Sequence, residues 1–324
     1  MNKINSQKSY ISFENKIFVA GHNGMVGSSI CRKLEAEGYK NILKINKASL
    51  DLRNSNEVED WFKQNKPDIV INAAGKVGGI LSNIKYPADF LLDNLKIQNN
   101  LIESSMKSKV KRFLFIATSS IYPKNINGLI KEEDLMSSNL EETNEYYSIA
   151  KIAGIKLCDA FRRQFDFDAI TVIPANLYGI GDKYHEEDSH VLPSLIRKFY
   201  LAKTQNLKVV DCWGTGSPIR EFLYVDDLSE SCLFLLEKWK PLSGKRNFIN
   251  VGVGNGISIK ELSEIIAKEF KFEGQIEWDL SKPDGMRKKV LNVEKINSLG
   301  WRSKIPIEIG IRKSIKDFDE RFSS

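Results

Sequence analysis

The sequence is poor in the residues that hold metal ions and disulfides. It has 4 cysteines and 3 histidines, and the cysteines are far apart, with no C-x-x-C pair, at Cys31, Cys158, Cys212 and Cys232. This spacing disfavours a zinc site and a disulfide framework, and it agrees with a reducing compartment. We therefore expect no bound metal and a cytoplasmic location.

Long apolar runs and clusters of one charge are also absent. No stretch approaches the roughly 18 to 20 apolar residues that cross a bilayer, and residues 1–14 lack the apolar core and cleavage site of a secretory signal. We expect residues 1–14 to form a flexible leader in the cytoplasm. Lysine and arginine (48) outnumber aspartate and glutamate (42), but the surplus is spread along the chain. Nucleic-acid binding usually needs a clustered basic stripe, so neither a nucleic acid nor a membrane is an expected partner.

The first half of the chain alternates short β-branched runs with long helical patterns. Apolar residues at three- and four-residue spacing predict helices over 25–37, 90–106 and 146–165. Strands are predicted between them at 16–20, 42–45, 68–72, 112–117 and 169–173. Such alternation predicts an α/β fold, a Rossmann-type doubly wound parallel sheet.

After about residue 175 the pattern becomes irregular and rich in turns, around predicted strands at 208–212 and 248–251 and a helix at 258–270. Loops of this kind often carry substrate-binding groups. We therefore divide the chain into a dinucleotide-binding domain over 15–175, to which it returns around 221–251, and a smaller α/β substrate lobe formed by 176–220 and 252–324.

A glycine-rich turn follows the first predicted strand. Gly21, Gly24 and Gly27 form the pattern G-x-x-G-x-x-G and lead into an amphipathic helix. Glycines allow the backbone to approach a pyrophosphate, which the positive end of the helix attracts. A glycine triplet alone is weak evidence, but its place between the first strand and the first helix predicts dinucleotide binding by this loop, including Asn23, Met25 and Val26.

The end of the second predicted strand favours NADP over NAD. An NAD-selective site usually offers a carboxylate to the ribose about 20 residues after the glycines, but no Asp or Glu occurs between Gly38 and Leu50. Lys44 and Lys47 would attract a 2′-phosphate instead, although both could be ordinary surface lysines. Asp51 and Leu52 are suitably placed to contact the adenine.

A tyrosine and a lysine four residues apart, Tyr147 and Lys151, fall on one face of a predicted helix. A nearby cation stabilises phenolate, and we expect it to lower the pKa of Tyr147 toward neutrality for proton exchange with a sugar alcohol or ketone. Thr118 ends the preceding strand, where its hydroxyl could bond the reacting oxygen. Ala73, after the third strand, supplies a small residue where the cofactor must pass close to the backbone.

With these motifs, the sequence resembles the extended short-chain dehydrogenase/reductase family. Within it, the segments AGHNGMVGS, SSIYPK, YSIAKIAGIKLC, DSHVLP, WGTGSPIREFLYVDD and SKPDG are most similar to the group of NADPH-dependent GDP-4-keto-6-deoxy-mannose epimerase-reductases, the GDP-L-fucose synthases. The resemblance implies Thr118, Tyr147 and Lys151 as the reductase triad and His190 as an acid or base that faces the sugar. It also implies cofactor contacts at Pro174, Asn176, Leu177 and His190, and nucleotide-sugar contacts at Lys198, Trp213, Arg220 and Asp284.

Two residues depart from the pattern of that group. Asn23 stands where the group usually has an arginine for the 2′-phosphate, so NADP selectivity would depend more on the lysines. Ser120 stands where the group has a cysteine that acts as a base. A serine hydroxyl is a much weaker acid than a thiol and needs an activating partner, and none lies beside Ser120 in the sequence. We therefore expect reduction at C4 to survive while proton exchange at C3 and C5 is slow, and Ser120→Cys to gain exchange.

The sequence therefore predicts an NADPH-dependent reductase that acts on the C4 ketone of a GDP-4-keto-6-deoxy-hexose, with a 3,5-epimerase activity left open. The alternatives are a C4 reductase without epimerase activity on a related sugar, a redox-neutral nucleotide-sugar C4 epimerase that retains NAD, and a non-catalytic NADP-binding sensor. The resemblance also implies a homodimer formed through the helices at 90–106 and 146–165.

Overall fold

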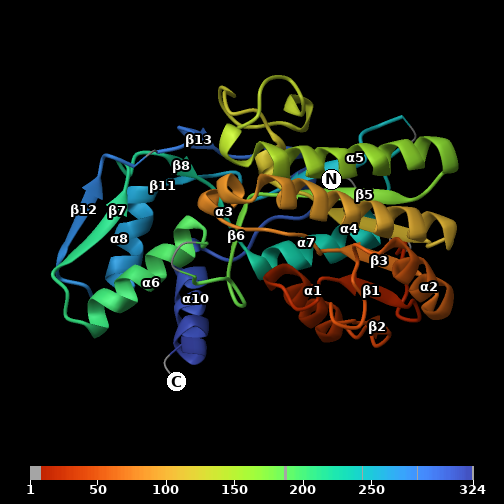
Figure 1. Cartoon of the computed structure of the whole chain (residues 1–324), viewed down its shortest axis with the longest axis horizontal. Coiled ribbons are helices and arrows are strands. Elements are labelled where there is room, and N and C mark those ends of the chain that lie inside the picture. Colours follow the sequence, from red (N-terminus) through yellow and green to blue (C-terminus); the bar gives the residue numbers. More distant parts are fainter. Residues whose placement is uncertain (1–8, 186–187, 243, 283, 323–324) are drawn as a thin grey trace, which may run out of the picture.

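The computed structural model describes residues 9–185, 188–242, 244–282 and 284–322. Within these ranges, a parallel sheet of six strands forms the centre of the first half of the chain (Figure 1). Its strands, in spatial order, are β10 (Phe248–Val251), β5 (Ala169–Pro174), β4 (Arg112–Ile116), β3 (Ile69–Asn72), β1 (Ile17–Ala20) and β2 (Ile42–Leu43). The predicted α/β class with a parallel Rossmann-type sheet is confirmed.

The strands form because continuous β-branched and aromatic runs suit a sheet that is buried on both faces. Every residue of β1, β3, β4, β5 and β10 is buried. β2 is shorter than predicted and ends at Leu43, at the edge of the sheet, where only β1 pairs with it.

Helices cover both faces of the sheet (Figure 1). On one face α4 packs against α2 and α5, and on the other α1 packs against α7. The bounds of these helices are Ser55–Asn65 for α2, Pro87–Lys107 for α4, Glu145–Phe165 for α5, Met25–Ala36 for α1 and Val225–Lys238 for α7. Shorter elements lie between them: α3 (Ile80–Lys85), α9 (Glu294–Ser298) and the 3-10 helices η1 (Ser119–Ile121), η2 (Glu132–Asp134) and η3 (Glu142–Asn144).

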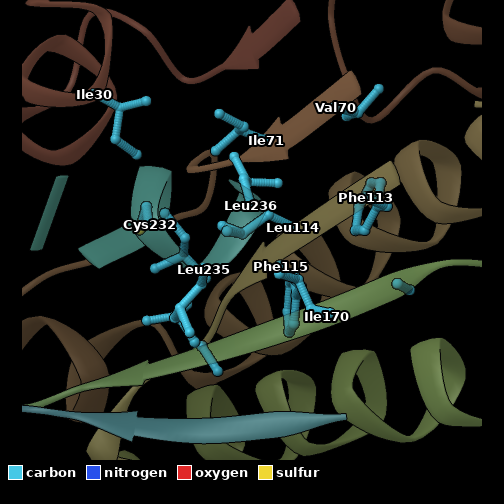
Figure 2. Close-up of a cluster of buried hydrophobic side chains, with 14 of the residues drawn as sticks. Ile30, Val70, Ile71, Phe113, Leu114, Phe115, Ile170, Cys232, Leu235 and Leu236 are labelled. Atoms are coloured by element: carbon cyan, nitrogen blue, oxygen red, sulfur yellow. The ribbon is translucent and has the colours of Figure 1, made fainter. Parts of the chain in front are cut away.

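The main core lies between the sheet and these helices. Figure 2 shows Ile71 and Leu114, from neighbouring strands, in one buried cluster with Cys232 and Leu236 of α7. Burial of a side chain of this size stabilises the fold by roughly 1.5–3 kcal/mol, so the central strands and α7 are held together although they are more than 100 residues apart in the sequence.

The order of the strands reverses beside β1. The chain goes from β1 to β2 at one edge, then crosses back to β3 on the other side of β1. Ligands of open α/β sheets bind at the carboxyl ends of strands where this reversal occurs. Here those ends adjoin, because Ala73 N–H, after β3, donates to the Ala20 carbonyl at the end of β1 over 3.0 Å.

The second half of the chain contributes three small sheets and a second buried core. The sheets pair β6 (Asn176–Tyr178) with β9 (Phe222–Tyr224), β7 (Val209–Trp213) with β12 (Gln275–Asp279), and β8 (Ile219–Arg220) with both β11 (Ile257–Ser258) and β13 (Lys288–Lys289). Their helices are α6 (Val191–Thr204), α8 (Ile259–Phe270) and α10 (Ile307–Phe322). Of these three helices, only α8 was predicted from the sequence, and Ser258 and Glu261 cap it reciprocally. In the described part of the chain no helix has both the length and the hydropathy of a membrane span.

The flexible leader predicted for residues 1–14 is wrong for residues 9–14. Tyr10 N–H donates to the Glu237 carbonyl over 3.0 Å, and Ile11 is buried in the main core. The apolar side chain of Ile11 fixes this segment against the sheet. Residues 1–8 lie outside the described residues.

Candidate functional site

At two of the three glycine positions in the loop after β1, the space admits no residue other than glycine. Gly21 has a φ of 84°, and a Cβ on it would lie 2.7 Å from the Ala74 nitrogen. A Cβ on Gly27 would lie 2.1 Å from the Gly21 carbonyl oxygen, whereas one on Gly24 would lie 3.5 Å from it. The loop is therefore folded tightly back on the start of α1.

The start of α1 fits the pyrophosphate of a dinucleotide. Its N-cap residue, Gly24, has no side chain to satisfy the first helical amides, and the first turn, which includes Met25 and Val26, holds no acidic residue. Amides and a positive helix end that no carboxylate neutralises attract a phosphate group. Together with the tight glycine turn and the reversal of strand order, this makes the predicted cofactor loop sterically and electrostatically suited to NAD or NADP.

The polar residues at the end of β2 lie against this loop. Asn23 Nδ2 donates to Asn46 Oδ1 over 2.7 Å, which joins the glycine loop to the segment after β2. Lys44 instead pairs with Glu35 of α1 over 2.6 Å, while Lys47 is exposed. Because Glu35 neutralises Lys44, Lys47 is the better candidate for a 2′-phosphate.

Asp51 is engaged by a cation within its own loop. Arg53 donates to both carboxylate oxygens of Asp51, with distances of 3.0 and 2.7 Å, and holds the pKa of Asp51 at about 2. The neighbouring Leu52 packs against the main core, and its carbonyl accepts from Asn100. The contact of Asp51 and Leu52 with adenine stays a prediction.

Tyr147 and Lys151 lie on the first two turns of α5, at the carboxyl end of β4. Tyr147 is half-buried and lies close enough to Thr118, the N-cap residue of η1, for that side chain to affect its pKa. Lys151 is buried: its Nζ donates to the Ile116 carbonyl over 3.1 Å and lies 5.9 Å from the centre of the Tyr147 ring. The structure thus brings together the three residues of the predicted triad.

The expected lowering of the pKa of Tyr147 by Lys151 is wrong for this structure. Burial raises the pKa of Tyr147 well above its ordinary value, and the nearby Thr118 side chain offsets this only in part. Burial also lowers the pKa of Lys151 to about 8. Tyr147 is consequently protonated at neutral pH, which suits a group that gives up a proton.

Ser120 lies in η1, two residues after Thr118, and its main chain is fixed by α5. Ser148 Oγ donates to the Ser120 carbonyl over 2.9 Å. Lys289 Nζ, from β13, donates to Ser120 Oγ over 3.1 Å. This partner is 169 residues away in the sequence and was not predicted. The only sequence signal was the Lys288–Lys289 pair after SKPDG, and alternation along a strand predicts that one of the two is buried.

The remaining predicted cofactor contacts surround the same strand ends. Pro174 ends β5, and Asn176 and Leu177 begin β6, where Asn176 Nδ2 donates to the Glu221 carbonyl over 3.0 Å. His190 is the N-cap residue of α6. His190 is exposed, and partial desolvation of its imidazole, and then the charge of Lys289, lower the pKa of His190.

The predicted nucleotide-sugar residues form a second group, on β7, β8 and the loop before β13. Asp284 accepts from the Thr215 amide over 2.7 Å and from the Thr215 hydroxyl over 2.8 Å, which ties that loop to the turn between β7 and β8. Arg220, on β8, is half-buried and feels the charge of Asp284. Trp213 is 51% exposed.

Lys198 lies on α6, outside the strands and the loop that carry the other three residues. Its Nζ donates to the Asp211 carbonyl over 2.7 Å, so its ammonium is held at β7.

Among the described residues, no group of three or more histidines, cysteines or carboxylates could hold a metal ion.

Residues 17–252 match the model of the NAD dependent epimerase/dehydratase family. The chain belongs to this family. The match begins at β1 and ends just after β10, so the epimerase/dehydratase family region includes the whole parallel sheet, the glycine loop and the Tyr147–Lys151 pair.

Members of the epimerase/dehydratase family and solved structures resemble nearly the whole chain. GDP-L-fucose synthase 1 of Arabidopsis thaliana is 48% identical over 299 residues, which are 92% of this chain and 91% of the relative. A GDP-6-OMe-4-keto-L-xylo-heptose reductase from C. jejuni has a TM-score of 0.90 at 31% identity, covering 96% and 99% of the two chains. A GDP-L-fucose synthetase from Naegleria fowleri bound to NADP has a TM-score of 0.88 at 25% identity, covering 98% of both chains.

Proposed function

We propose that this protein is an NADPH-dependent reductase of the C4 ketone of a GDP-4-keto-6-deoxy-hexose, and that it exchanges protons at C3 and C5 before the reduction. The observation that carries the proposal is the grouping of the protonated, half-buried Tyr147 with Thr118 beside it and the buried Lys151 one turn further along α5. The names of the relatives support GDP-linked keto sugars as the substrate class. The cofactor is NADP(H), in keeping with the NADP-bound neighbour.

Different residues of this chain would bind the cofactor and transfer the proton during reduction. Gly21, Gly24, Gly27 and the start of α1 would hold the pyrophosphate, and Lys47 the 2′-phosphate. When bound, NADPH supplies the hydride. Tyr147 gives its phenolic proton to the ketone oxygen as negative charge develops there, and Thr118 lies close enough to hydrogen-bond the same oxygen.

Lys151 stabilises the phenolate that remains on Tyr147 after the proton has left. An ammonium buried beside the ring does so more strongly than it would in water, because few water dipoles screen the charge. Arg220 and Asp284, with Lys198 and Trp213, would bind the nucleotide diphosphate and base. In this proposal the cofactor lies on the parallel sheet and the nucleotide sugar on the substrate lobe formed by 176–220 and 252–324.

One further candidate is a C4 reductase without epimerase activity. Ser120 in place of the cysteine of the GDP-L-fucose synthase group favours it, and so does the likeness to a protein described as a heptose reductase. The deciding measurement is NADPH oxidation with GDP-4-keto-6-deoxy-mannose, followed by NMR of the product. Reduction with inversion at C3 and C5 supports the epimerase-reductase, reduction without inversion supports the second candidate, and no oxidation with any GDP-keto sugar excludes both.

Two more features belong to this proposal. The family suggests a homodimer formed through α4 and α5, which lie side by side on one face of the sheet (Figure 1). Sedimentation of the purified protein tests it. The four cysteines are unpaired and buried, which supports a place in the reducing cytoplasm.

Lys47→Glu is expected to shift cofactor preference from NADPH toward NADH. A carboxylate at this position repels a 2′-phosphate and accepts a hydrogen bond from a free 2′-hydroxyl. The measurement is the ratio of kcat/KM for the two cofactors. Lys44→Glu is the matched control, because Lys44 is paired with Glu35 and should change the ratio much less. Equal ratios in wild type and Lys47→Glu would show that Lys47 is ordinary surface charge.

The rate of reduction is expected to fall above about pH 8. Lys151, whose pKa burial lowers to about 8, is cationic below this pH and neutral above it, so phenolate stabilisation is lost as the pH rises. We expect kcat under saturating NADPH to drop up to tenfold per pH unit on that side of the profile. In Lys151→Arg the guanidinium keeps its charge, and the descending limb should move to higher pH. A limb that stays in place in this variant would contradict the assignment.

A further inference from the structure

Ser120 and Lys289 form a partly buried contact that involves none of the three residues of the reductase triad. Lys289 is 9% exposed, and its Nζ lies 3.1 Å from Ser120 Oγ. In the part of the chain that the structure describes, Lys289 makes no ion pair. Buried lysines usually have a carboxylate partner, so an amine that bonds only a serine hydroxyl is costly to keep.

The charged and titratable side chains around Lys289 come from separate segments of the chain. Arg220 of β8 is its register partner and opposes its positive charge, while Glu141, before η3, and Glu221, after β8, favour it. Lys289 in turn acts on His190 at the start of α6. Burial first, and then Arg220, lower the pKa of Lys289 to about 7.

The Glu221 carboxylate cannot neutralise Lys289 by direct contact. Its Oε1 accepts from the Val253 and Gly254 amides over 2.5 and 2.7 Å, and its Oε2 accepts from the Leu291 amide over 2.7 Å. These bonds point the carboxylate at the main chain. Because its pKa is lowered to about 7, Lys289 can release its proton near neutral pH. The neutral amine is then a proton acceptor within hydrogen-bond distance of Ser120 Oγ.

We propose that Lys289 activates Ser120, which stands where the GDP-L-fucose synthase group has its catalytic cysteine, and that the two form a dyad that removes and returns the proton on one of the carbons next to the substrate ketone. The inference rests on the proposed function, since it assigns the base for the exchange at C3 and C5. Ser120 is the residue that meets the carbon-bound proton, two positions from Thr118, and Lys289 is the group that makes its hydroxyl basic.

The step balances in protons and electrons. Ser120 Oγ takes the proton from the carbon as its own hydroxyl proton passes to the lone pair of Lys289. The carbon–hydrogen electron pair forms the enolate, whose negative charge lies on the ketone oxygen, next to Tyr147 and Thr118. A proton returned to the carbon from the imidazolium form of His190, on α6, completes inversion, and one returned from Ser120 completes exchange without inversion. After inversion, water takes the proton from Lys289 and returns one to His190. No oxidant or reductant takes part.

This dyad changes the expectation for Ser120. Slow exchange was predicted because no activating group lies near Ser120 in the sequence, and the structure supplies one from β13. We now expect wild-type exchange to be fast enough to precede reduction, and to depend on both members of the pair.

The rival role for Lys289 is a cation that binds the substrate diphosphate, since Arg220 lies beside it. Arginine can replace lysine as a cation but does not deprotonate near neutral pH. A base and a binding cation therefore respond differently to Lys289→Arg, which makes this variant the informative one.

The test measures deuterium incorporation at C3 and C5 of GDP-4-keto-6-deoxy-mannose by NMR in D2O, with NADP+ in place of NADPH so that no reduction competes. Lys289→Met, Lys289→Arg and Ser120→Ala are each expected to lower the exchange rate at one carbon at least about a hundredfold. Lys288→Met, on the exposed neighbour in the same strand, is expected to match wild type. Wild-type exchange should rise with pH through about 7 and then level off, because Lys289 accepts a proton only when neutral.

The outcomes separate the inference from the proposed function. Wild-type exchange that survives in Lys289→Met within about threefold overturns the dyad and leaves the epimerase-reductase standing, and so does exchange restored by Lys289→Arg. A wild-type protein that reduces the sugar but incorporates no deuterium overturns both the dyad and the epimerase half. Loss in all three variants with an unchanged KM for the sugar in the reduction assay establishes the dyad.

Discussion

Tyr147→Phe is expected to lower the turnover of reduction at least about a hundredfold, which is the usual contribution of a general acid. Burial keeps Tyr147 protonated, and its side chain lies near Thr118, just beyond the end of β4. The phenyl ring of the variant retains the edge contact with Phe90, whose ring centre lies 6.2 Å away. The fold and the affinity for NADPH should therefore be unchanged, as thermal unfolding and fluorescence titration with the cofactor would measure.

The matched control for this variant is Tyr146→Phe. Tyr146 is the preceding residue on α5 and is 47% exposed, so loss of its hydroxyl should leave turnover close to that of wild type. If Tyr147→Phe kept near-normal turnover, Tyr147 would have no part in the proton transfer, and the proposed mechanism would fail.

Gly27→Ala is expected to weaken NADPH binding at least tenfold. A Cβ at this position would lie 2.1 Å from the Gly21 carbonyl oxygen and 2.8 Å from the His22 Cα, both of them main-chain atoms that no side-chain rotation can move. Relief of such overpacking typically costs about 1–3 kcal/mol. The glycine turn must open, and its amides then no longer converge on the pyrophosphate. Isothermal titration with NADPH gives the change directly.

Gly24→Ala provides the comparison within the same loop. Its Cβ would lie 3.5 Å from the Gly21 carbonyl oxygen, and its φ of −79° suits any residue. We expect an affinity within a few-fold of wild type. Equal losses in the two variants would mean that the loop tolerates no added side chain at all, and that the particular packing of Gly27 on Gly21 has no special role.

The parts of the fold that were predictable from the sequence are those set by local patterns. Unbroken buried runs such as Ile69–Asn72 and Arg112–Ile116 identified the strands, and the glycine spacing predicted the tight turn between β1 and α1. The proximity of Tyr147, Lys151 and Thr118 was also predictable, because Tyr147 and Lys151 are separated by one helical turn and Thr118 follows a strong strand signal.

Other parts of the site depend on contacts between distant segments. Nothing in the sequence decides whether Lys288 or Lys289 is buried, because β13 has only two residues and no periodicity to read. The direction of the pKa shift of Tyr147 was wrong for a similar reason. The four-residue spacing indicates that Lys151 is near, but it does not reveal how completely the surrounding protein excludes water.

The position of β13 in the chain bears on how the enzyme matures during synthesis. The edge strand β10 ends at Val251 of 324 residues, so the parallel sheet can close once about three-quarters of the chain has left the ribosome. Lys289 is made later and must then reach Ser120 across the two halves of the molecule. The nascent chain can thus complete its parallel sheet before Lys289, the second member of the proposed dyad, has been synthesised, so under this proposal proton transfer at Ser120 is the last function that the growing chain acquires.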